Sequence, residues 1–390
     1  MIRSELKFRD LFPRYATDLY PTVNYSEELC DTLERIRGEI RLLARERHAL
    51  ILAHYYERPE IQETADFVGD SLGLGLKARE LLETRPDVKE IWLCAVRFMG
   101  DTIKVILGDR VSVFMPEFAG CSLVGSILGI DFDYRTDSAE EISRRLLVEQ
   151  PRIHPVRKWV DEHPDGLVLS YMNSDLESKA LSYAVFTSRN AQKVLEYVMR
   201  ENPGKPIFML PDQYLTELVL RRAKIYGSTV IRPELVEIFP GLCHVHKQKI
   251  SPFVLDEAMA NYPEADLLVH PECGCAVDCL IRAETGQLGS RKTFIASTQE
   301  MIDYAKRSDT ARQFIVATET GHVYTLRKNV PDKQFMPVTP AATCEFMKST
   351  TLDKLFKSME ENNSASYEVN VSEDIRKRAL GAIERMLSIT

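Results

Sequence analysis

From Ala49 onward, short apolar runs alternate with amphipathic stretches of about ten to fifteen residues. Apolar strands separated by helices predict parallel sheets that are covered by helices on both faces, which is an α/β fold. In such sheets ligands bind at the carboxyl ends of the strands. The apolar runs are ALILAHY, EIWLCAV, VSVFMP, LVLSYMN, PIFMLPD, ADLLVHP, KTFIAS and QFIVATE.

Three of these strands end in polar side chains, and each is followed by a hydroxyl residue that is expected to open a helix. This order, recurring along the chain, indicates duplicated units. Helix capping by Ser or Thr explains the hydroxyls equally well, but it does not explain polar residues at the ends of apolar strands. The three sets are His54, Tyr56 and Ser71; Tyr171, Asn173 and Ser188; and His270, Glu272 and Thr298.

The spacing within the third set differs from that in the other two. The interval from strand end to hydroxyl is the same in the first two sets (71 − 54 = 188 − 171 = 17) and longer in the third (298 − 270 = 28). An insertion within Cys273–Phe294, with a length equal to the difference (28 − 17 = 11), reconciles the three intervals. The predicted units are residues 49–130, 131–246 and 247–349, preceded by an N-terminal extension and amphipathic helix (1–48) and followed by C-terminal helices (350–390).

Three isolated cysteines add one thiol to each unit. Cys121, Cys243 and Cys344 are separated by similar intervals (243 − 121 = 122 and 344 − 243 = 101). They also follow the three hydroxyls at similar intervals (121 − 71 = 50, 243 − 188 = 55 and 344 − 298 = 46). Three thiolates around an iron–sulfur cluster leave one iron open for Lewis-acid chemistry. The alternative is that these are buried thiols that only pack, which is common for free cysteine.

The bulk properties favour a cytoplasmic enzyme. A net charge of −8 and a pI near 5.7 argue against nucleic-acid binding. No apolar run reaches the roughly 18 residues that a membrane span needs, and Met1–Tyr20 does not resemble a signal peptide. Eight cysteines in such a chain read as thiols or metal ligands rather than a disulfide framework.

The regions that flank the units have simple patterns. Asn24–His48 is predicted to be an amphipathic helix capped by Asn24, and Ser372–Thr390 a last amphipathic helix. Asp131–Asp165 reads as a charged connector and Asn363–Val371 as a polar linker.

A set of ordered sequence blocks resembles the quinolinate synthase family from roughly Ala49 to Leu355. The resemblance implies three similar three-layer α/β/α domains, with short parallel sheets, around a pseudo-threefold axis and a central [4Fe–4S] cluster. The blocks are AHYYERPEIQETADFVGDSLGL, VRFMGDTIKVILG, SYMNSDLESKAL, TSRNA, LPDQYL, FPGLCHVH, HPE, ATETG and VPDKQF.

The resemblance also implies an activity and its partners. The family is a transferase of de novo NAD biosynthesis that condenses iminoaspartate with dihydroxyacetone phosphate, releasing phosphate and two waters to give quinolinate. An open iron of the cluster serves as the Lewis acid. The implied partners are these small molecules, with functional coupling to an enzyme that oxidises L-aspartate.

Site residues carry over from matching positions. The implied cluster ligands are Cys121, Cys243 and Cys344. Glu272 is implied as general base, with His246 as another active-site residue, although His244 lies close enough to substitute. Tyr56, Tyr171 and Asn173 are implied to position the substrate and shuttle protons, while carboxylate or phosphate is implied to bind His54, Ser71, Ser188, His270 and Thr298.

The chain departs from the family pattern in the run CGCAVDC. Its thiols at Cys273, Cys275 and Cys279 are open to three interpretations: a zinc site, a disulfide or buried thiols. Buried thiols are favoured because no fourth ligand is evident nearby. Arg97 is open to a structural ion pair as readily as to a functional role.

Overall fold

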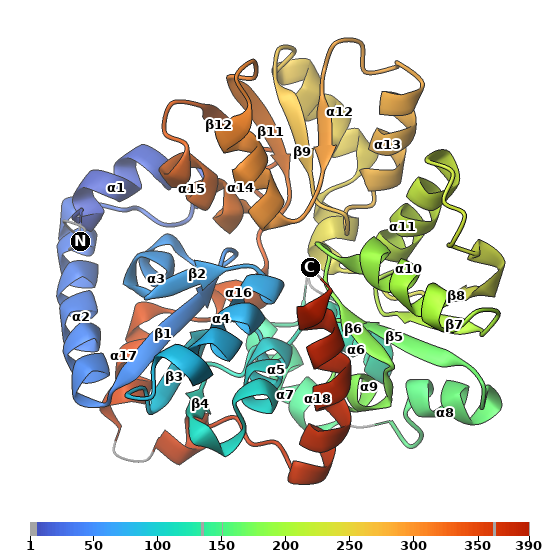
Figure 1. Cartoon of the computed structure of the whole chain (residues 1–390). Coiled ribbons are helices and arrows are strands. Elements are labelled where there is room, and N and C mark those ends of the chain that lie inside the picture. The colour runs from blue at the N-terminus through green and yellow to red at the C-terminus, as the bar shows by residue number, and fades with distance from the viewer. Residues whose placement is uncertain (1–5, 134–135, 150, 362–363, 390) are drawn as a thin grey trace.

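The computed structural model describes residues 6–133, 136–149, 151–361 and 364–389, in which three separate four-stranded sheets form (Figure 1). All strand pairings within these sheets are parallel, and in each sheet the strands run in the order second, first, third, fourth. The predicted α/β fold with three related units is therefore confirmed. The strands are β1 (Ala49–His54), β2 (Phe67–Gly69), β3 (Glu90–Cys94) and β4 (Ser112–Phe114); β5 (Leu167–Tyr171), β6 (Ala184–Phe186), β7 (Ile207–Leu210) and β8 (Val236–Ile238); and β9 (Asp266–Val269), β10 (Thr293–Ile295), β11 (Gln313–Ala317) and β12 (Gln334–Pro337).

We call the segments around these three sheets the first, second and third units, and their exact boundaries stay predictions. In Figure 1 the first unit is blue to teal, the second green and the third yellow to orange. The helices of the first unit are α3 (Pro59–Thr64), α4 (Ser71–Thr84), α5 (Arg97–Leu107) and α6 (Ser122–Leu128); those of the second are α7 (Ala139–Val148), α8 (Pro155–Glu162), α9 (Leu176–Leu181), α10 (Ala191–Glu201) and α11 (Gln213–Ile225); and those of the third are α12 (Pro252–Asn261), α13 (Ala276–Glu284), α14 (Thr298–Arg307), α15 (Thr320–Asn329) and α16 (Glu345–Lys348).

Strand register places the insertion of the third unit. His54 pairs with Gly69 and Tyr171 with Phe186, so the offset is the same in both units (69 − 54 = 186 − 171 = 15). In the third unit Val269 pairs with Ile295, which is a longer offset (295 − 269 = 26). The difference (26 − 15 = 11) equals the insertion inferred from the sequence. It lies between β9 and β10, where α13 stands in place of the short helices α3 and α9.

The segment predicted as a charged connector contains two helices, α7 and α8. Ser138 caps α7 by accepting a hydrogen bond from the N–H of Glu141 (3.1 Å), and Pro155 occupies the first turn of α8. Trp159 of α8 is buried against Phe208 of β7, with ring centroids 5.0 Å apart. Helix α8 of the connector therefore packs on the second sheet, whereas α7 contacts α6 and α16.

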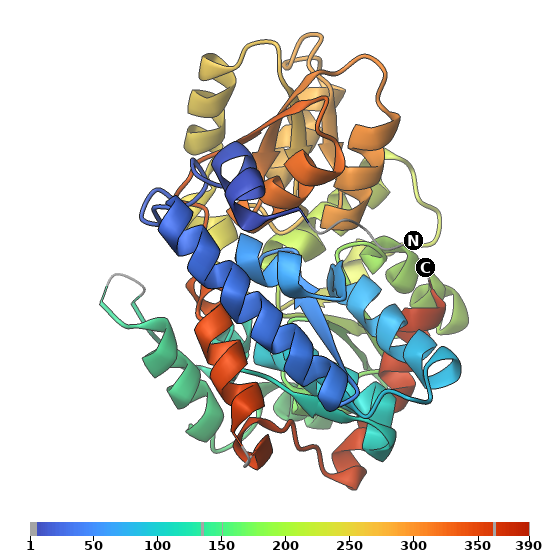
Figure 2. The same ribbon diagram turned by 90° about the vertical axis from the view of Figure 1, so that its left-hand side faces the viewer.

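The N-terminal segment forms α1 (Phe8–Tyr15) and α2 (Glu27–Glu46). The predicted cap at Asn24 is wrong: Ser26 caps α2, because its side chain accepts from the N–H of Leu29 (3.2 Å). Helix α2 packs along α17 (Leu352–Glu360) and β1 (Figure 2). Helix α1 also contacts α15, so the extension joins the first unit to the third.

Helix α18 (Glu373–Ser388) begins after its cap Ser372, at the predicted position. It packs on α9 and β6 of the second unit and on α4 and α5 of the first. Asn190 donates hydrogen bonds from Nδ2 to the carbonyls of Met386 (3.0 Å) and Ile389 (2.6 Å). The predicted linker before this helix includes Asn363, which lies outside the described residues.

Candidate active site

One central cavity of about 60 Å³ collects all thirteen site residues expected from the sequence. The cavity lies at the carboxyl ends of β1, β5 and β9, because each of these strands ends at or next to a lining residue. Parallel strands thus deliver their last side chains to one place. The thirteen residues are His54, Tyr56, Ser71, Cys121, Tyr171, Asn173, Ser188, Cys243, His246, His270, Glu272, Thr298 and Cys344.

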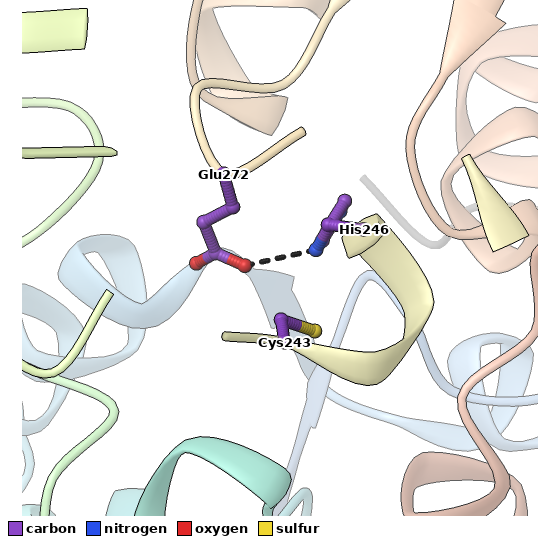
Figure 3. Close-up of side chains that lie close together, drawn as sticks. All are labelled: Cys243, His246 and Glu272. Atoms are coloured by element: carbon purple, nitrogen blue, oxygen red, sulfur yellow. Dashed lines mark ion pairs between the residues drawn. The ribbon is translucent and has the colours of Figure 1, made fainter. Parts of the chain in front are cut away.

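Glu272 is a buried carboxylate that three side chains of this cavity contact. Nδ1 of His246 lies 3.0 Å from Oε2 of Glu272 (Figure 3). The hydroxyl of Tyr171 donates a hydrogen bond to Oε1, and Nδ2 of Asn173 donates to the same oxygen over 3.5 Å. Three side chains of the second unit therefore hold a buried carboxylate of the third unit in place.

The surroundings of Glu272 favour its ionised form. Burial by itself raises the pKa of this carboxyl, but His246, His270 and the hydroxyl of Tyr171 together lower it to about 2. Burial also raises the pKa of Tyr171 well above its ordinary value, and the negative charge of Glu272 adds to this. At neutral pH the pair is a carboxylate that accepts from a neutral phenol.

Two further histidines of the cavity stay uncharged at neutral pH. Burial and the charge of His270 lower the pKa of His54 to about 3. Burial also lowers the pKa of His270, to about 4, although the charge of Glu272 opposes the shift. Both rings therefore act as neutral hydrogen-bonding groups.

Each cluster-candidate cysteine stands at the start of a helical turn. Cys121 and Cys344 are the N-caps of α6 and α16, and Cys243 precedes a π-helical turn at Val245–Lys249. Burial raises the pKa of all three thiols, that of Cys121 to about 12, although nearby backbone N–H groups oppose the rise. A bound metal deprotonates a coordinating thiol outright.

A tighter group of potential ligand atoms also lies in the cavity. One ligand atom each of Cys243, His246 and Glu272 lies within 4.8 Å of the others (Figure 3). Cys121 and Cys344 stand outside this group. A cluster binds each thiolate through a different iron, so its ligands need not meet as closely as those of a single ion.

The three hydroxyls differ in their local structure. Ser71 and Thr298 are the first residues of α4 and α14, but the caps are Asp70, which accepts from the N–H of Gly73 (2.7 Å), and Ser297. Capping therefore does not account for Ser71 or Thr298. The expectation that Ser188 also opens a helix is wrong. Helix α10 begins three residues later, at Ala191, because Oδ1 of Asn190 accepts from the N–H of Thr187 (2.8 Å) and closes a turn.

Comparison with known proteins decides the family. A family model described as quinolinate synthetase A protein matches residues 38–388. The chain belongs to the quinolinate synthase family. A quinolinate synthase of Thermus thermophilus is 39% identical over 357 residues, covering 91% of this chain and 98% of that protein. One of Pyrobaculum aerophilum is 36% identical over 351 residues (90% and 98%), and one of Dehalococcoides mccartyi is 35% identical over 356 residues (91% and 99%).

The quinolinate synthase motifs of this chain include residues that the sequence analysis did not single out. Oγ1 of Thr318 lies 2.7 Å from the hydroxyl of Tyr56 and 3.4 Å from Nε2 of His246. Glu319 is fully buried and lines the cavity. Both follow directly after β11, so the rule that polar residues at strand ends face the site would have found them.

In this member of the quinolinate synthase family, the structure also bears on two residues whose roles the sequence left open, His246 and Arg97. His246, rather than His244, contacts Glu272, while Nε2 of His244 lies 2.9 Å from Oε2 of Glu345. Arg97 forms an ion pair with Asp101 at 3.6 Å.

The three cysteines of the run CGCAVDC are free thiols, and all of them are buried as expected: Cys273, Cys275 and Cys279. No helix within the described residues combines the length and apolar character that crossing a membrane requires.

Proposed function

We propose that this protein synthesises quinolinate in the pathway to NAD, by condensing iminoaspartate with dihydroxyacetone phosphate and releasing phosphate and two waters. The observation that carries the proposal is the buried, ionised Glu272, held by His246 and Tyr171 in the same cavity as three cysteines. Relatives that match nearly this whole chain carry the name quinolinate synthase.

The donor set of the cavity fits a [4Fe–4S] cluster held by Cys121, Cys243 and Cys344. All three sulfurs face one cavity, and each stands where free N–H groups at the start of a helical turn favour a thiolate. When bound, such a cluster supplies an iron without a protein thiolate, which acts as a Lewis acid toward a leaving hydroxyl.

Glu272 is proposed as the general base of the enolisation and dehydration steps. Its low pKa keeps it unprotonated at neutral pH, and His246 and Tyr171 fix its direction. Tyr56 has a pKa well above its ordinary value because it is buried, so its hydroxyl remains a donor. Tyr56, Tyr171 and Asn173 thus position the substrate and relay protons.

The substrate anions are proposed to bind the small polar groups of the cavity. Ser71 and Thr298 present hydroxyls at helix starts, where free N–H groups and the helix dipole favour negative charge. Ser188 adds a hydroxyl from the turn before α10. His54 and His270 contribute neutral hydrogen-bonding rings, which bind an anion without a counter-charge.

Water hydrolyses an imine such as iminoaspartate, so this substrate must be used soon after it is made. We therefore infer that the protein lies in the cytoplasm, beside an enzyme that oxidises L-aspartate.

The test is direct. Anaerobically purified protein, reconstituted with iron and sulfide, is mixed with dihydroxyacetone phosphate and freshly generated iminoaspartate, and quinolinate is quantified by chromatography. We expect product with the native chain and almost none with Glu272→Gln. Absence of quinolinate from native protein with a full iron complement would overturn the proposed function.

A further inference from the structure

A second cavity of about 270 Å³ adjoins the central one, and we call it the outer cavity. Ser188 lines both cavities. Pro271, between His270 and Glu272 of the central cavity, also lines the outer one. The residues that line the outer cavity lie on or just before α10, on α11, and just after β9 of the third unit.

Cations dominate the lining of the outer cavity. Arg189, Lys193 and Arg222 face it, against the single carboxylate of Glu196, which accepts a hydrogen bond from Gln192 (3.0 Å). The chain as a whole carries a net charge of −8. A local cluster of positive charge on an acidic protein attracts anions to that spot.

Two of these cations have no carboxylate partner within the described ranges. Lys193 and Arg222 enter no ion pair there, and Arg222 donates from Nη2 to the carbonyl of Ile295 (2.5 Å). Arg222 is partly buried; burial lowers its pKa, and the charges of Tyr226 and Glu300 oppose that shift. A partly buried guanidinium without a counter-ion gains free energy from an anionic ligand.

One donor of the third cation, Arg189, has an acceptor and another has none in the described part of the chain. Nη2 of Arg189 donates to Oδ2 of Asp70 over 2.6 Å, which fixes the side chain beside α4. Its Nε atom is buried and has no hydrogen-bond acceptor among the described residues. This residue of the outer cavity lining therefore keeps one donor without an acceptor from the residues described.

We propose that Arg189, Lys193 and Arg222 form an outer subsite for a phosphate monoester, which is held beside Ser188 before it enters the central cavity. Two guanidinium groups and an ammonium match a dianionic phosphate, which has three oxygens to share among them. That the ligand is the triose phosphate rests on the proposed function, whereas the binding of phosphate to the subsite does not.

The binding test uses cluster-loaded protein and isothermal titration with inorganic phosphate, glycerol phosphate and malate, at low ionic strength. Lys193→Gln/Arg222→Gln should weaken glycerol phosphate binding by about tenfold or more, the loss expected when even one charged hydrogen bond is removed. The matched controls Arg200→Gln on α10 and Arg221→Gln on α11 remove equal charge from exposed positions outside the outer cavity, and they should bind as the native protein does.

Lys193→Gln alone changes an exposed side chain, so it tests the subsite even if Arg222→Gln lowers the melting temperature. We expect a severalfold loss for Lys193→Gln. Unchanged affinity in the double variant, or a loss that is equal for malate and for glycerol phosphate, overturns the proposal.

Turnover provides a second measurement. The double variant should raise KM for dihydroxyacetone phosphate about tenfold at nearly constant kcat, because the subsite acts before the chemical steps. The titrations require no turnover, so a chain that makes no quinolinate can still confirm or overturn the phosphate subsite. Conversely, normal glycerol phosphate binding by the double variant in an active enzyme overturns the subsite alone.

Discussion

The backbone N–H of Cys344 donates a hydrogen bond to Oε1 of Glu319, with 3.0 Å between nitrogen and oxygen. The same buried carboxylate accepts from the N–H of Gly321 (2.7 Å) and pairs with Nζ of Lys348 (2.9 Å). Lys348 also donates to the carbonyl of Tyr56. Glu319 therefore ties the turn that carries a cluster-candidate cysteine to the end of β1.

Glu319→Gln should lower both stability and iron content. Removing one charge of a buried ion pair costs about 3–5 kcal/mol, and the turn at Cys344 loses its anchor. Chemical denaturation and an iron assay after anaerobic purification measure the two effects. The matched control is Glu360→Gln, an exposed carboxylate on α17. Native iron content in Glu319→Gln would show that Cys344 is held by other contacts.

The three cavity cysteines should account for the metal. We expect anaerobic protein to hold about four irons per chain, the content of one [4Fe–4S] cluster. Serine at Cys121, Cys243 or Cys344 should abolish it, while Cys275→Ser should retain it. Iron that survives Cys243→Ser but is lost in Cys275→Ser contradicts this ligand set.

Glu272→Gln should retain iron and lose turnover by about 10²–10⁴-fold, the usual contribution of a positioned base. Single-turnover rates of quinolinate formation measure the loss. Glu264→Gln, at an exposed carboxylate just before β9, is the control and should react at the native rate. Near-native turnover in Glu272→Gln would remove this residue from the mechanism.

Quinolinate binding should depend on the hydroxyls of the cavity. Ser71→Ala, Ser188→Ala and Thr298→Val should each weaken binding by about 10- to 100-fold, because a hydrogen bond to a charged group contributes roughly 1.5–3 kcal/mol. Titration of each variant with its cluster intact measures this. Thr84→Val, at the other end of α4, serves as the control. Unaltered affinity in all three variants means that the anions bind elsewhere.

The free energy of unfolding should depend less on pH when His322 is replaced. Burial, with the charges of His270 and His54, lowers the pKa of His322 well below its ordinary value of 6.5. As the pH falls below 6.5 the unfolded chain gains a proton that the folded protein does not, so this residue lowers the free energy of unfolding. His322→Leu should reduce this pH-dependent loss in the free energy of unfolding by up to about 1.4 kcal/mol per pH unit. Urea denaturation at about pH 7.5 and 5.5 tests this, and an unchanged difference between the two contradicts it.

The sequence predicted the central strands and the convergence of the site because both depend on apolar runs. β1, β5 and β9 are buried runs that end in polar side chains, a pattern that survives without any knowledge of the contacts. The short edge strands β2, β6, β8 and β12 were not predicted. A run of three or four residues carries too little periodicity to be distinguished from a loop.

Features that depend on tertiary contacts could not be predicted from sequence patterns of this kind. Ser188 precedes a helix at the expected spacing, yet the turn closed by Asn190 delays the helix start. The basic lining of the outer cavity combines Arg189, from the turn before α10, with Arg222 of α11, and nothing in either local sequence pairs them. Only the packing of α10 beside α11 brings these charges together.

The position of α18 has a consequence for how the chain is made. Ribosomes synthesise a chain from its N-terminus to its C-terminus. Helix α18 is therefore made after all three units, although it packs against the first two. The nascent first and second units must therefore expose the apolar faces of α5 and α9 until the third unit has been translated. During that interval we expect chaperones to bind the unfinished protein, and a helper that covers these faces should raise its yield.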